Sequence, residues 1–284
     1  MLPAPRVPAA PLLVRGIDAL GPSAGRLLVV VGAFDGLHRG HTYLLRRLRE
    51  AAVRLDARPA VLTFDHHPDE IVRGAAPPVL CDPDERLVRL AEAGVAVTIV
   101  EHFDAQLRAT PYTAFVEHIR ERAGLAGFLM TPDAAFGRDR EGTPETLGRL
   151  GRRDGFAVVV VPPFEVDGRQ VRSNAIRSQI AAGDLRSAAR LLGRRVAAVG
   201  QARPSGFGAT TIDFPMPVAT PPSGRYRVVV GPAWSPATGA PRAVGTATAD
   251  VDADAQRLVL RSRAGLPAGP RLRVAFVAPR SRPG

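Results

Sequence analysis

The hydrophobic residues of this 284-residue chain follow two patterns, which change near residue 194. In the first part, short apolar runs alternate with longer stretches whose apolar residues recur at helical spacing. Such runs are typical of strands buried in a parallel sheet, and such stretches of amphipathic helices. The expected strands are 27–31, 60–64, 95–100, 127–130 and 156–161. The expected helices are 42–55, 83–93, 111–123, 144–153, 174–182 and 185–192.

This alternation predicts an α/β fold with a doubly wound parallel sheet. Two helix starts carry their own signals. Thr110 is expected to cap the helix that opens with Pro111, and Thr143 to cap the helix over 144–153. Ligands of doubly wound sheets bind beyond the carboxyl ends of the strands, so the loops after Val31, Phe64 and Met130 are the expected places for chemistry.

The second part of the chain is richer in Pro, Gly and Thr, and its apolar residues alternate with period two. This pattern predicts short strands separated by turns, as in a small barrel or sandwich. The expected strands are 225–230, 244–249, 258–261 and 272–277. We therefore divide the chain into a first domain over 1–193, expected to fold alone, and a smaller β domain over 194–284.

The composition is that of a globular protein, with 45% hydrophobic and 23% charged residues. No apolar run approaches the ~20 residues that span a bilayer. The first residues contain four prolines before any apolar stretch and do not resemble a secretory leader. A cytoplasmic protein that does not interact with membranes is expected.

The net charge of +11 comes entirely from arginine, because all 38 basic residues are Arg and the chain contains no Lys. This excludes mechanisms that need a lysine, such as a Walker A loop or a Schiff base. The arginines are scattered and aromatic residues make up only 5%, so a nucleic-acid partner is not expected. Anionic small molecules explain the charge instead. Nothing in the sequence indicates an oligomeric state.

No metal site held by the protein is predicted. Cys81 is the one cysteine of the chain, which excludes a cysteine-based site and an internal disulfide. His38 and His41 have no third ligand near them in sequence.

The main candidate for chemistry follows the first expected strand. It reads Gly32-Ala33-Phe34-Asp35-Gly36-Leu37-His38-Arg39-Gly40-His41. Its glycines allow a ligand close to the backbone, and the helix that starts near His41 directs unpaired N–H groups into the same space. His38 and His41 lie three positions apart and so face the same side of a helical turn. Two imidazole donors at a helix N-terminus suit the charge that develops on a phosphoryl group under attack.

The string resembles the HxGH signature of the nucleotidyltransferase superfamily, and its FDGxHxGH form is similar to bacterial FAD synthetases. The resemblance runs from about residue 14 to residue 200 and implies a Rossmann-like fold. It implies that His38 and His41 act on the α-phosphoryl group, and that the segment supplies nucleotide-binding positions. These positions are Gly32, Phe34, Asp35, Gly36 and Gly40.

Three further segments resemble the same family. Thr63-Phe64-Asp65-His66-His67-Pro68 is similar to its TFxPHP segment, with His66 in place of a proline. The resemblance implies that Phe64, His67 and Pro68 bind the flavin.

The segment from Thr131 to Gly142 resembles GxDFxFGxxRxG, with Thr131 in place of a glycine and Ala134 in place of a phenylalanine. It implies that Asp133 binds the nucleotide and Phe136 the flavin. The loss of the aromatic side chain at Ala134 is expected to change the shape of the base or flavin pocket.

The segment Arg172-Ser173-Asn174-Ala175-Ile176-Arg177 is similar to SSTxIR, with Arg172 and Asn174 as departures. It implies that Ser173 and Arg177, helped by Arg172, hold the β- and γ-phosphates, with Arg177 counted among the catalytic residues. Asn174 retains the ability to cap the helix that follows.

In bifunctional members of the family the C-terminal domain is a riboflavin kinase barrel marked by GxPTAN, whose Thr and Asn serve Mg²⁺–ATP. Here the corresponding region, 206–213, has no PTAN. We expect a shortened barrel without kinase activity.

The expected reaction is transfer of AMP from ATP to FMN, which gives FAD and pyrophosphate, with Mg²⁺ brought by the nucleotide. One alternative is a diverged nucleotidyltransferase that acts on another phosphorylated acceptor. A second is a regulator that binds flavin or nucleotide without catalysis.

Overall fold

The computed structural model describes residues 10–206, 208–240, 244–262, 265–267 and 269–277. These residues form two compact units, each made of several segments of the chain. The first contains the described residues of Met1–Ala33 together with Leu44–Ile71 and Leu90–Pro162. The second contains Phe34–Tyr43, Val72–Arg89 and the described residues of Pro163–Gly284. The segment 206–213, expected to correspond to GxPTAN, is described except for position 207.

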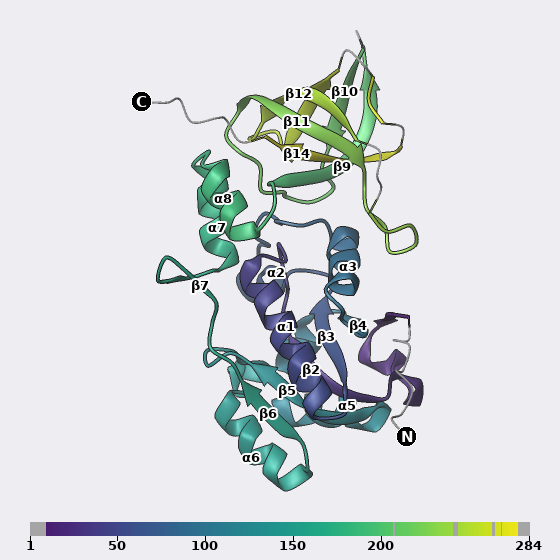
Figure 1. Ribbon diagram of the computed structural model, residues 1–284, viewed down its shortest axis with the longest axis vertical. Helices are drawn as coiled ribbons and strands as arrows, with labels where there is room; N and C mark the ends of the chain where they lie inside the picture. Colours follow the sequence, from purple (N-terminus) through teal and green to yellow (C-terminus); the bar gives the residue numbers. More distant parts are fainter. Residues whose placement is uncertain (1–9, 207, 241–243, 263–264, 268, 278–284) are drawn as a thin grey trace, which may run out of the picture. The chain divides into compact units, whose positions relative to one another are not determined.

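The first unit is built on a six-stranded sheet of order β1-β4-β3-β2-β5-β6 (Figure 1). All of its strands are parallel. They are β1 (Leu12–Arg15), β2 (Arg26–Val31), β3 (Arg58–Phe64), β4 (Val97–Glu101), β5 (Gly124–Met130) and β6 (Ala157–Val160). The predicted doubly wound sheet is confirmed, with β1 as an additional strand. β1 has only four residues, which follow a proline-rich stretch, so its sequence carries little strand signal.

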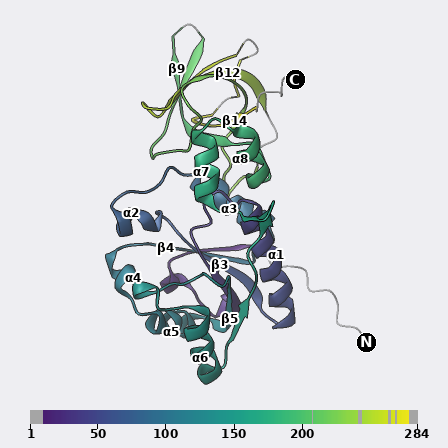
Figure 2. The ribbon, with the colours of Figure 1, turned by 90° about the vertical axis from the view of Figure 1, so that its left-hand side faces the viewer.

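Helices cover both faces of this sheet. They include α1 (Arg39–Arg54), which belongs to this unit from Leu44 on, together with α4 (Ala105–Ala109), α5 (Tyr112–Arg122) and α6 (Pro144–Asp154). Two further helices, α2 (Pro68–Arg73) and α3 (Pro83–Glu92), contain the points at which the chain passes from one unit to the other. Figure 2 shows α1 on one side of β3 and β4, with α4 and α5 on the other. The core between the sheet and α5 includes fully buried Phe128, Val29 and Ile119.

One of the two predicted helix caps is confirmed. The side chain of Thr143 accepts from Thr146 N, and the Thr146 hydroxyl accepts from Thr143 N, which together make a capping box at the start of α6. The expected cap at Thr110 is wrong. Thr110 ends α4, and Pro111 precedes α5 as its N-cap without a side-chain hydrogen bond. A proline that could open a helix and a threonine that could cap it do not by themselves show where the previous helix ends.

The second unit contains two helices and a closed antiparallel barrel of order β10-β13-β12-β11-β14-β9. The helices are α7 (Ser173–Ala181) and α8 (Leu185–Leu192). The barrel strands are β9 (Ala197–Ser205), β10 (Ala209–Asp213), β11 (Gly224–Pro232), β12 (Gly245–Asp252), β13 (Arg257–Arg261) and β14 (Arg271–Phe276). A short hairpin of β7 (Glu165–Val166) and β8 (Arg169–Gln170) precedes α7. The predicted barrel is confirmed, although the sequence did not predict β9 or β10.

β9 was missed because its sequence, AAVGQARPS, does not alternate apolar and polar residues. The glycine at position 200 of this strand is required by the close approach of the neighbouring strand. A Cβ atom at this position would lie 2.6 Å from the carbonyl oxygen of Asp213 on the neighbouring strand. Only glycine allows the two backbones to approach this closely.

One continuous apolar core joins the barrel interior to α7 and α8. It includes Val228, Leu258 and Val274 from the barrel together with Ile176 and Leu192 from the helices. The predicted boundary at 193/194 falls between α8 and β9 and stays a prediction. The shared core, however, argues against the expectation that residues 1–193 fold alone, because α7 and α8 bury their apolar sides in a cluster that the barrel completes.

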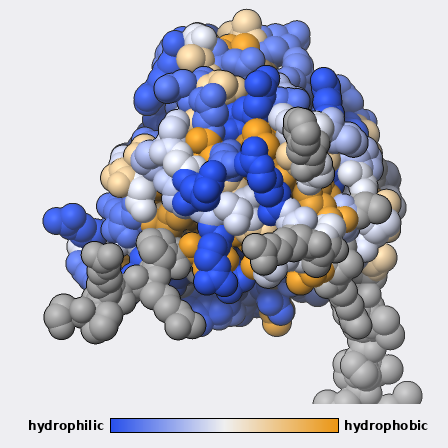
Figure 3. Space-filling view, turned by 90° about the horizontal axis from the view of Figure 1, so that it is seen from above, coloured by the Kyte–Doolittle hydropathy of each residue, from blue (hydrophilic) through white to orange (hydrophobic). Residues whose placement is uncertain are grey.

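The surface shown in Figure 3 mixes hydrophilic and hydrophobic residues where grey atoms do not cover it. Its apolar residues are separated by polar ones, which is ordinary for a protein surface. None of the helices among the described residues has the length and apolarity needed to cross a membrane.

Candidate active site

The signature segment begins where β2 ends. Gly32, just after the strand, donates from its N–H to Leu62 O at 3.0 Å. The chain then turns sharply through residues with positive φ, namely Phe34 at +50°, Gly36 at +84° and Leu37 at +37°. Left-handed backbone is uncommon for a phenylalanine or a leucine, and such strain clusters at functional sites.

Two glycines of the segment sit where a side chain would be tightly crowded. A Cβ atom at Gly36 would lie 3.1 Å from the side chain of Leu80. At Gly40 it would lie 3.1 Å from the His38 ring and 3.2 Å from Val171 O. Gly40 therefore lets the first turn of α1 pass directly beside the imidazole of His38.

The two signature histidines are stacked, with ring centroids 3.7 Å apart and an interplanar angle of 15°. His38 immediately precedes α1, and its Nδ1 accepts from His41 N at 3.3 Å. It thus caps the helix, and as a neutral imidazole it carries its proton on Nε2. The Phe34 ring lies 5.0 Å from the His41 ring. The Nδ1 atom of His41 is buried and has no hydrogen-bond partner among the described residues.

Both imidazoles are neutral at pH 7. Burial, followed by the charges of Arg194 and Arg177, lowers the pKa of His38 to about 4. Burial, followed by the charge that His38 carries only when protonated and by the charge of Arg194, lowers the pKa of His41 well below its ordinary value. Each ring can therefore donate one N–H, and neither brings a positive charge.

Asp35 and Arg177 connect the signature to α7. The Arg177 guanidinium donates to a carboxylate oxygen of Asp35, to Pro78 O at 2.8 Å and to Asn174 Oδ1 at 2.8 Å. The other carboxylate oxygen of Asp35 accepts from Leu80 N at 2.9 Å. Both side chains are largely buried, with 13% of Arg177 and 6% of Asp35 exposed. The pair holds three separate segments of the second unit together.

Ser173 is the first residue of α7, and its hydroxyl donates to Asp35 O at 3.0 Å. Arg172 is the N-cap residue of the helix but makes no side-chain cap; its guanidinium donates to Gln170 Oε1 at 2.9 Å. Asn174, expected as a cap, lies inside the first turn and accepts from Arg177 instead. The structure thus brings Ser173 and Arg177 to the signature, and their role in holding the β- and γ-phosphates stays a prediction.

Sequence reasoning missed Arg194 and the segment around Leu80. Arg194 follows Gly193, which ends α8 in the left-handed conformation, and its Nη1 donates to Leu37 O at 3.3 Å. The contacts of Pro78 and Leu80 are made by backbone atoms, which leave no trace in the sequence. A buried Glu85 accepts from Arg89 and Arg273 at 2.8 Å each. These groups meet only because the fold brings distant segments together.

The remaining predicted site residues lie in the first unit. Phe64 ends β3, and its ring meets that of Phe103 edge-on at 5.1 Å. His67 Nδ1 accepts from Asp69 N at 3.2 Å, and Pro68 begins α2. All three lie at or just after the carboxyl end of β3, and their flavin-binding role stays a prediction.

Asp133 and Phe136 follow β5. Asp133 Oδ1 accepts from the Thr131 hydroxyl at 2.8 Å. The Phe136 ring packs against Phe115 and Phe128, at centroid distances of 5.2 and 5.3 Å. It therefore belongs partly to the core. A cavity of about 180 Å³ opens beside it, at the ends of β2 and β5. Its lining includes Val31, Met130, Thr131, Ala134, Phe136 and Arg140.

Comparison with known proteins agrees with this arrangement. Residues 22–175, more than half of the chain, match the FAD synthetase family. A bifunctional riboflavin kinase/FMN adenylyltransferase from Pseudomonas fluorescens is 34% identical over 183 residues, which are 64% of this chain and 59% of that protein. Proteins of the same name from Haemophilus influenzae and Escherichia coli K12 are 33% and 32% identical, over 72% of this chain and 67% and 66% of their own lengths.

A crystal structure of a protein named macrolide-efflux protein, from Streptococcus pneumoniae, has a TM-score of 0.74 at 22% identity. The superposition covers 95% of this chain and 91% of that one, and it shows likeness of fold alone. The family match and the identity to the curated relatives show more than the fold. The match runs from residue 22, ahead of β2, to residue 175 in the first turn of α7, and the chain belongs to the FAD synthetase family.

Proposed function

We propose that the protein transfers the adenylyl group of ATP to FMN. An oxygen of the FMN phosphate attacks the α-phosphorus of ATP and forms the new P–O bond. The bond from the α-phosphorus to the oxygen that bridges it to the β-phosphorus breaks, and pyrophosphate leaves. The products are FAD and pyrophosphate, and no covalent enzyme intermediate is needed.

The observation that carries the proposal is the stacked pair of His38 and His41 at the N-terminus of α1. The rings are neutral, one Nδ1 is buried without a partner among the described residues, and the helix dipole adds a positive potential. Preorganised N–H donors at a helix N-terminus stabilise charge that develops on a phosphoryl group. This is the chemistry that adenylyl transfer requires.

Arg177 has two tasks in this proposal. Its bonds to Asp35 and Pro78 position the signature loop before any substrate binds. A guanidinium carries five N–H donors, so donors remain for the β- and γ-phosphates once these bonds are made. The Ser173 hydroxyl donates to Asp35 O and so holds the start of α7 at the signature. The N–H groups at the start of α7 are then available to the same phosphates.

The carboxylate of the signature does not suit a metal held by the protein, because Asp35 is bonded to Arg177 and Leu80. We therefore infer that Mg²⁺ reaches the enzyme on the phosphates of ATP, as it commonly does. There it neutralises charge on the pyrophosphate that leaves.

We further propose that riboflavin kinase activity is absent. The region expected to correspond to GxPTAN, 206–213, has no PTAN, and neither does the stretch just beyond β10, where methionine, proline and valine follow Pro215 in Phe214-Pro215-Met216-Pro217-Val218. Val218 is buried and pairs with Val79. Neither the side chain of Met216 nor that of Val218 carries an oxygen that could serve Mg²⁺–ATP.

A second candidate function is adenylylation of another phosphorylated acceptor. Ala134, which stands where the family has phenylalanine, lines the cavity beside Phe136, so the pocket is wider at this point than an aromatic residue would allow. The experiment is incubation of the purified protein with Mg²⁺, ATP and one acceptor at a time, followed by chromatography. FMN should be the preferred acceptor in a panel that includes nicotinamide mononucleotide and 4′-phosphopantetheine. A faster reaction with another acceptor supports the second candidate, and binding without product from any acceptor supports a regulator.

A further inference from the structure

Two neighbouring strands bring two histidines and an aspartate together, at the end of the sheet in the first unit. Asp65 and His66 directly follow β3, and His102 directly follows β4. β3 and β4 are parallel, and Phe64 is paired with Glu101. The chains therefore leave the sheet side by side, which places residues 37 positions apart in contact.

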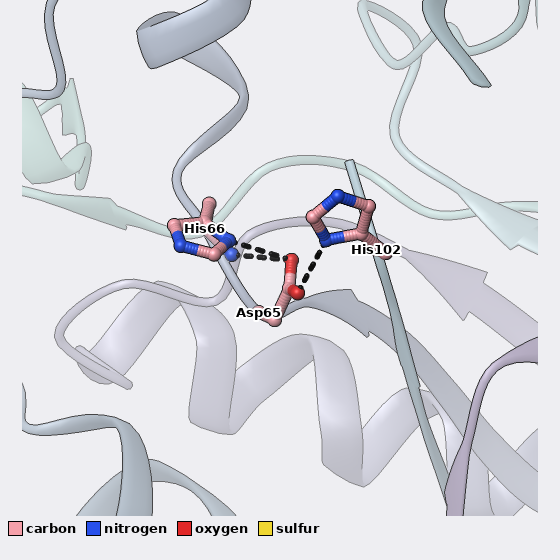
Figure 4. A group of neighbouring side chains, drawn as sticks. All are labelled: Asp65, His66 and His102. Atoms are coloured by element: carbon pink, nitrogen blue, oxygen red, sulfur yellow. Dashed lines mark hydrogen bonds and ion pairs between the residues drawn. The ribbon is translucent and has the colours of Figure 1, made fainter. Parts of the chain in front are cut away.

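Figure 4 shows both imidazoles turned toward the carboxylate of Asp65. His102 Nδ1 lies 2.7 Å from Asp65 Oδ2, and His66 Nδ1 lies 3.1 Å from Asp65 Oδ1. One nitrogen of each ring and a carboxylate oxygen all lie within 4.8 Å of one another. Two nitrogens and an oxygen thus converge on one point, from two segments of the chain.

We propose that Asp65, His66 and His102 bind one divalent transition-metal ion of the Zn²⁺ type. Imidazole nitrogen and carboxylate oxygen are preferred ligands of such ions. Bonds of roughly 2.1 Å in a tetrahedral site separate the ligand atoms by about 3.4 Å. The observed separations of 2.7 and 3.1 Å, which run to different oxygens of Asp65, need to widen by less than an ångström. Ligand atoms that lie farther apart, at most 4.8 Å, need to draw together to admit the ion.

The surroundings favour this adjustment. The side chains of His66 and His102 are 56% and 63% exposed, so both rings are free to turn, and remaining coordination positions face solvent. Asp65, in contrast, is fixed by the backbone. Its Oδ1 accepts from His66 N at 2.7 Å and from Phe103 N at 3.3 Å. A carboxylate that is oriented by hydrogen bonds before the ion arrives is a feature of metal sites.

Another histidine–aspartate pair in the same unit shows what the cluster adds. His118 Nε2 lies 2.8 Å from Asp18 Oδ1, much as in the cluster. The second partner of Asp18 is the guanidinium of Arg122, at 2.8 Å. An arginine cannot ligate a metal, so this pair offers two ligands and a positive charge where the cluster offers three ligands. It is a matched control.

The test is calorimetric titration of the tag-free full-length protein, after treatment with EDTA and dialysis, with Zn²⁺. We expect one ion per chain. Binding should weaken at least about tenfold in His102→Gln, in His66→Gln and in Asp65→Asn, and stay within twofold of the wild type in His118→Gln. Mg²⁺ should not compete, because it prefers oxygen ligands in an octahedral arrangement. Circular dichroism checks that each variant is folded.

Proton–nitrogen correlation spectra of the histidine side chains locate the ion without any substitution. Zn²⁺ should shift the ring resonances of His66 and His102 and leave those of His118 in place. The proposal is overturned if the wild type binds no Zn²⁺, if His102→Gln and Asp65→Asn bind it as tightly as the wild type, or if the shifted resonances belong to His38 and His41. The result does not depend on adenylyl transfer.

Discussion

Arg177 donates from its guanidinium to the carboxylate of Asp35, a residue 142 positions earlier in the chain. The bond links the helix α7 to the strained turn that carries the signature histidines. Since Asp35 also accepts from Leu80 N, and Arg177 also donates to Pro78 O, one ion pair organises three segments. The position of the histidines therefore depends on Arg177, although none of the hydrogen bonds described for Arg177 goes to His38 or His41.

This arrangement predicts strong coupling between the two side chains. Removing one partner leaves the other charge buried, so Arg177→Gln and Asp35→Asn should each lower the free energy of unfolding by about 3 kcal/mol. The double variant should lose at least about 1 kcal/mol less than the sum of the single changes. Chemical denaturation of the four proteins gives the cycle.

The control for this cycle is Arg149→Gln. Arg149 pairs with Glu145 on the surface of α6, with 58% and 80% of the side chains exposed, and an exposed pair contributes less than about 1 kcal/mol. If the losses in the Arg177 and Asp35 variants are as small as in the control, or if they simply add, the pair does not organise the loop.

Replacement of His41 tests its role in chemistry. If its imidazole donates to the α-phosphoryl group as charge develops, His41→Ala should lower kcat by roughly 10²–10³ and weaken ATP binding far less. His118→Ala, on the exposed surface of α5, should leave kcat unchanged. Rapid-quench kinetics with saturating ATP and FMN measure both. An unchanged kcat in His41→Ala means that His41 takes no part in the chemical step and that the segment only binds the nucleotide.

The depressed pKa of His38 predicts how stability depends on pH. The unfolded chain protonates this histidine below about pH 6.5, whereas the folded protein keeps it neutral to about pH 4. The unfolded state therefore binds more protons between these values, and stability that is fully present above pH 6.5 is lost as the pH falls. Integrated to pH 5, His38 contributes about 2 kcal/mol of this loss.

Chemical denaturation between pH 7.5 and 5 measures this slope, and the variant His38→Gln isolates the contribution, because glutamine does not titrate. The free energy of unfolding of His38→Gln should fall less steeply than that of the wild type. Parallel curves for the two proteins mean that His38 keeps an ordinary pKa in the fold.

Truncation tests the shared core of the second unit. A chain that ends after Arg194 exposes the apolar sides of α7 and α8, which include Ile176, Ile180, Leu185 and Leu192. Several buried aliphatic side chains at 1.5–3 kcal/mol each amount to a loss of about 5 kcal/mol or more. Limited proteolysis with mass spectrometry should find new cleavage in 173–192. Protection there equal to that of the full chain shows that 1–193 is an independent domain.

Local pattern was sufficient to predict the parallel sheet, because buried strands such as LLVV at 27–30 and the amphipathic helices between them carry strong signals. The barrel was predicted from its later strands, whereas β9 lacks alternation and β10 was not recognised. The signature, Ser173 and Arg177 were found from motifs. Arg194 and Leu80 were not found, because both make contacts with residues far away in the sequence. The contact of Leu80 with Asp35 is also made by its backbone N–H, which any residue could supply. The contact between His102 and Asp65 could not be predicted, because it depends on the pairing of β3 with β4.

The central claim is that the enzyme transfers the adenylyl group of ATP to FMN and no longer phosphorylates riboflavin. The most direct measurement uses ATP labelled with ³²P at either the α- or the γ-phosphate, with FMN and riboflavin offered in separate reactions, and follows the label by chromatography. The account predicts that α-label appears in FAD and γ-label in pyrophosphate when FMN is offered, and that γ-label never appears in FMN when riboflavin is offered. The absence of α-label from FAD contradicts the proposed reaction, and γ-label in FMN contradicts the loss of the kinase.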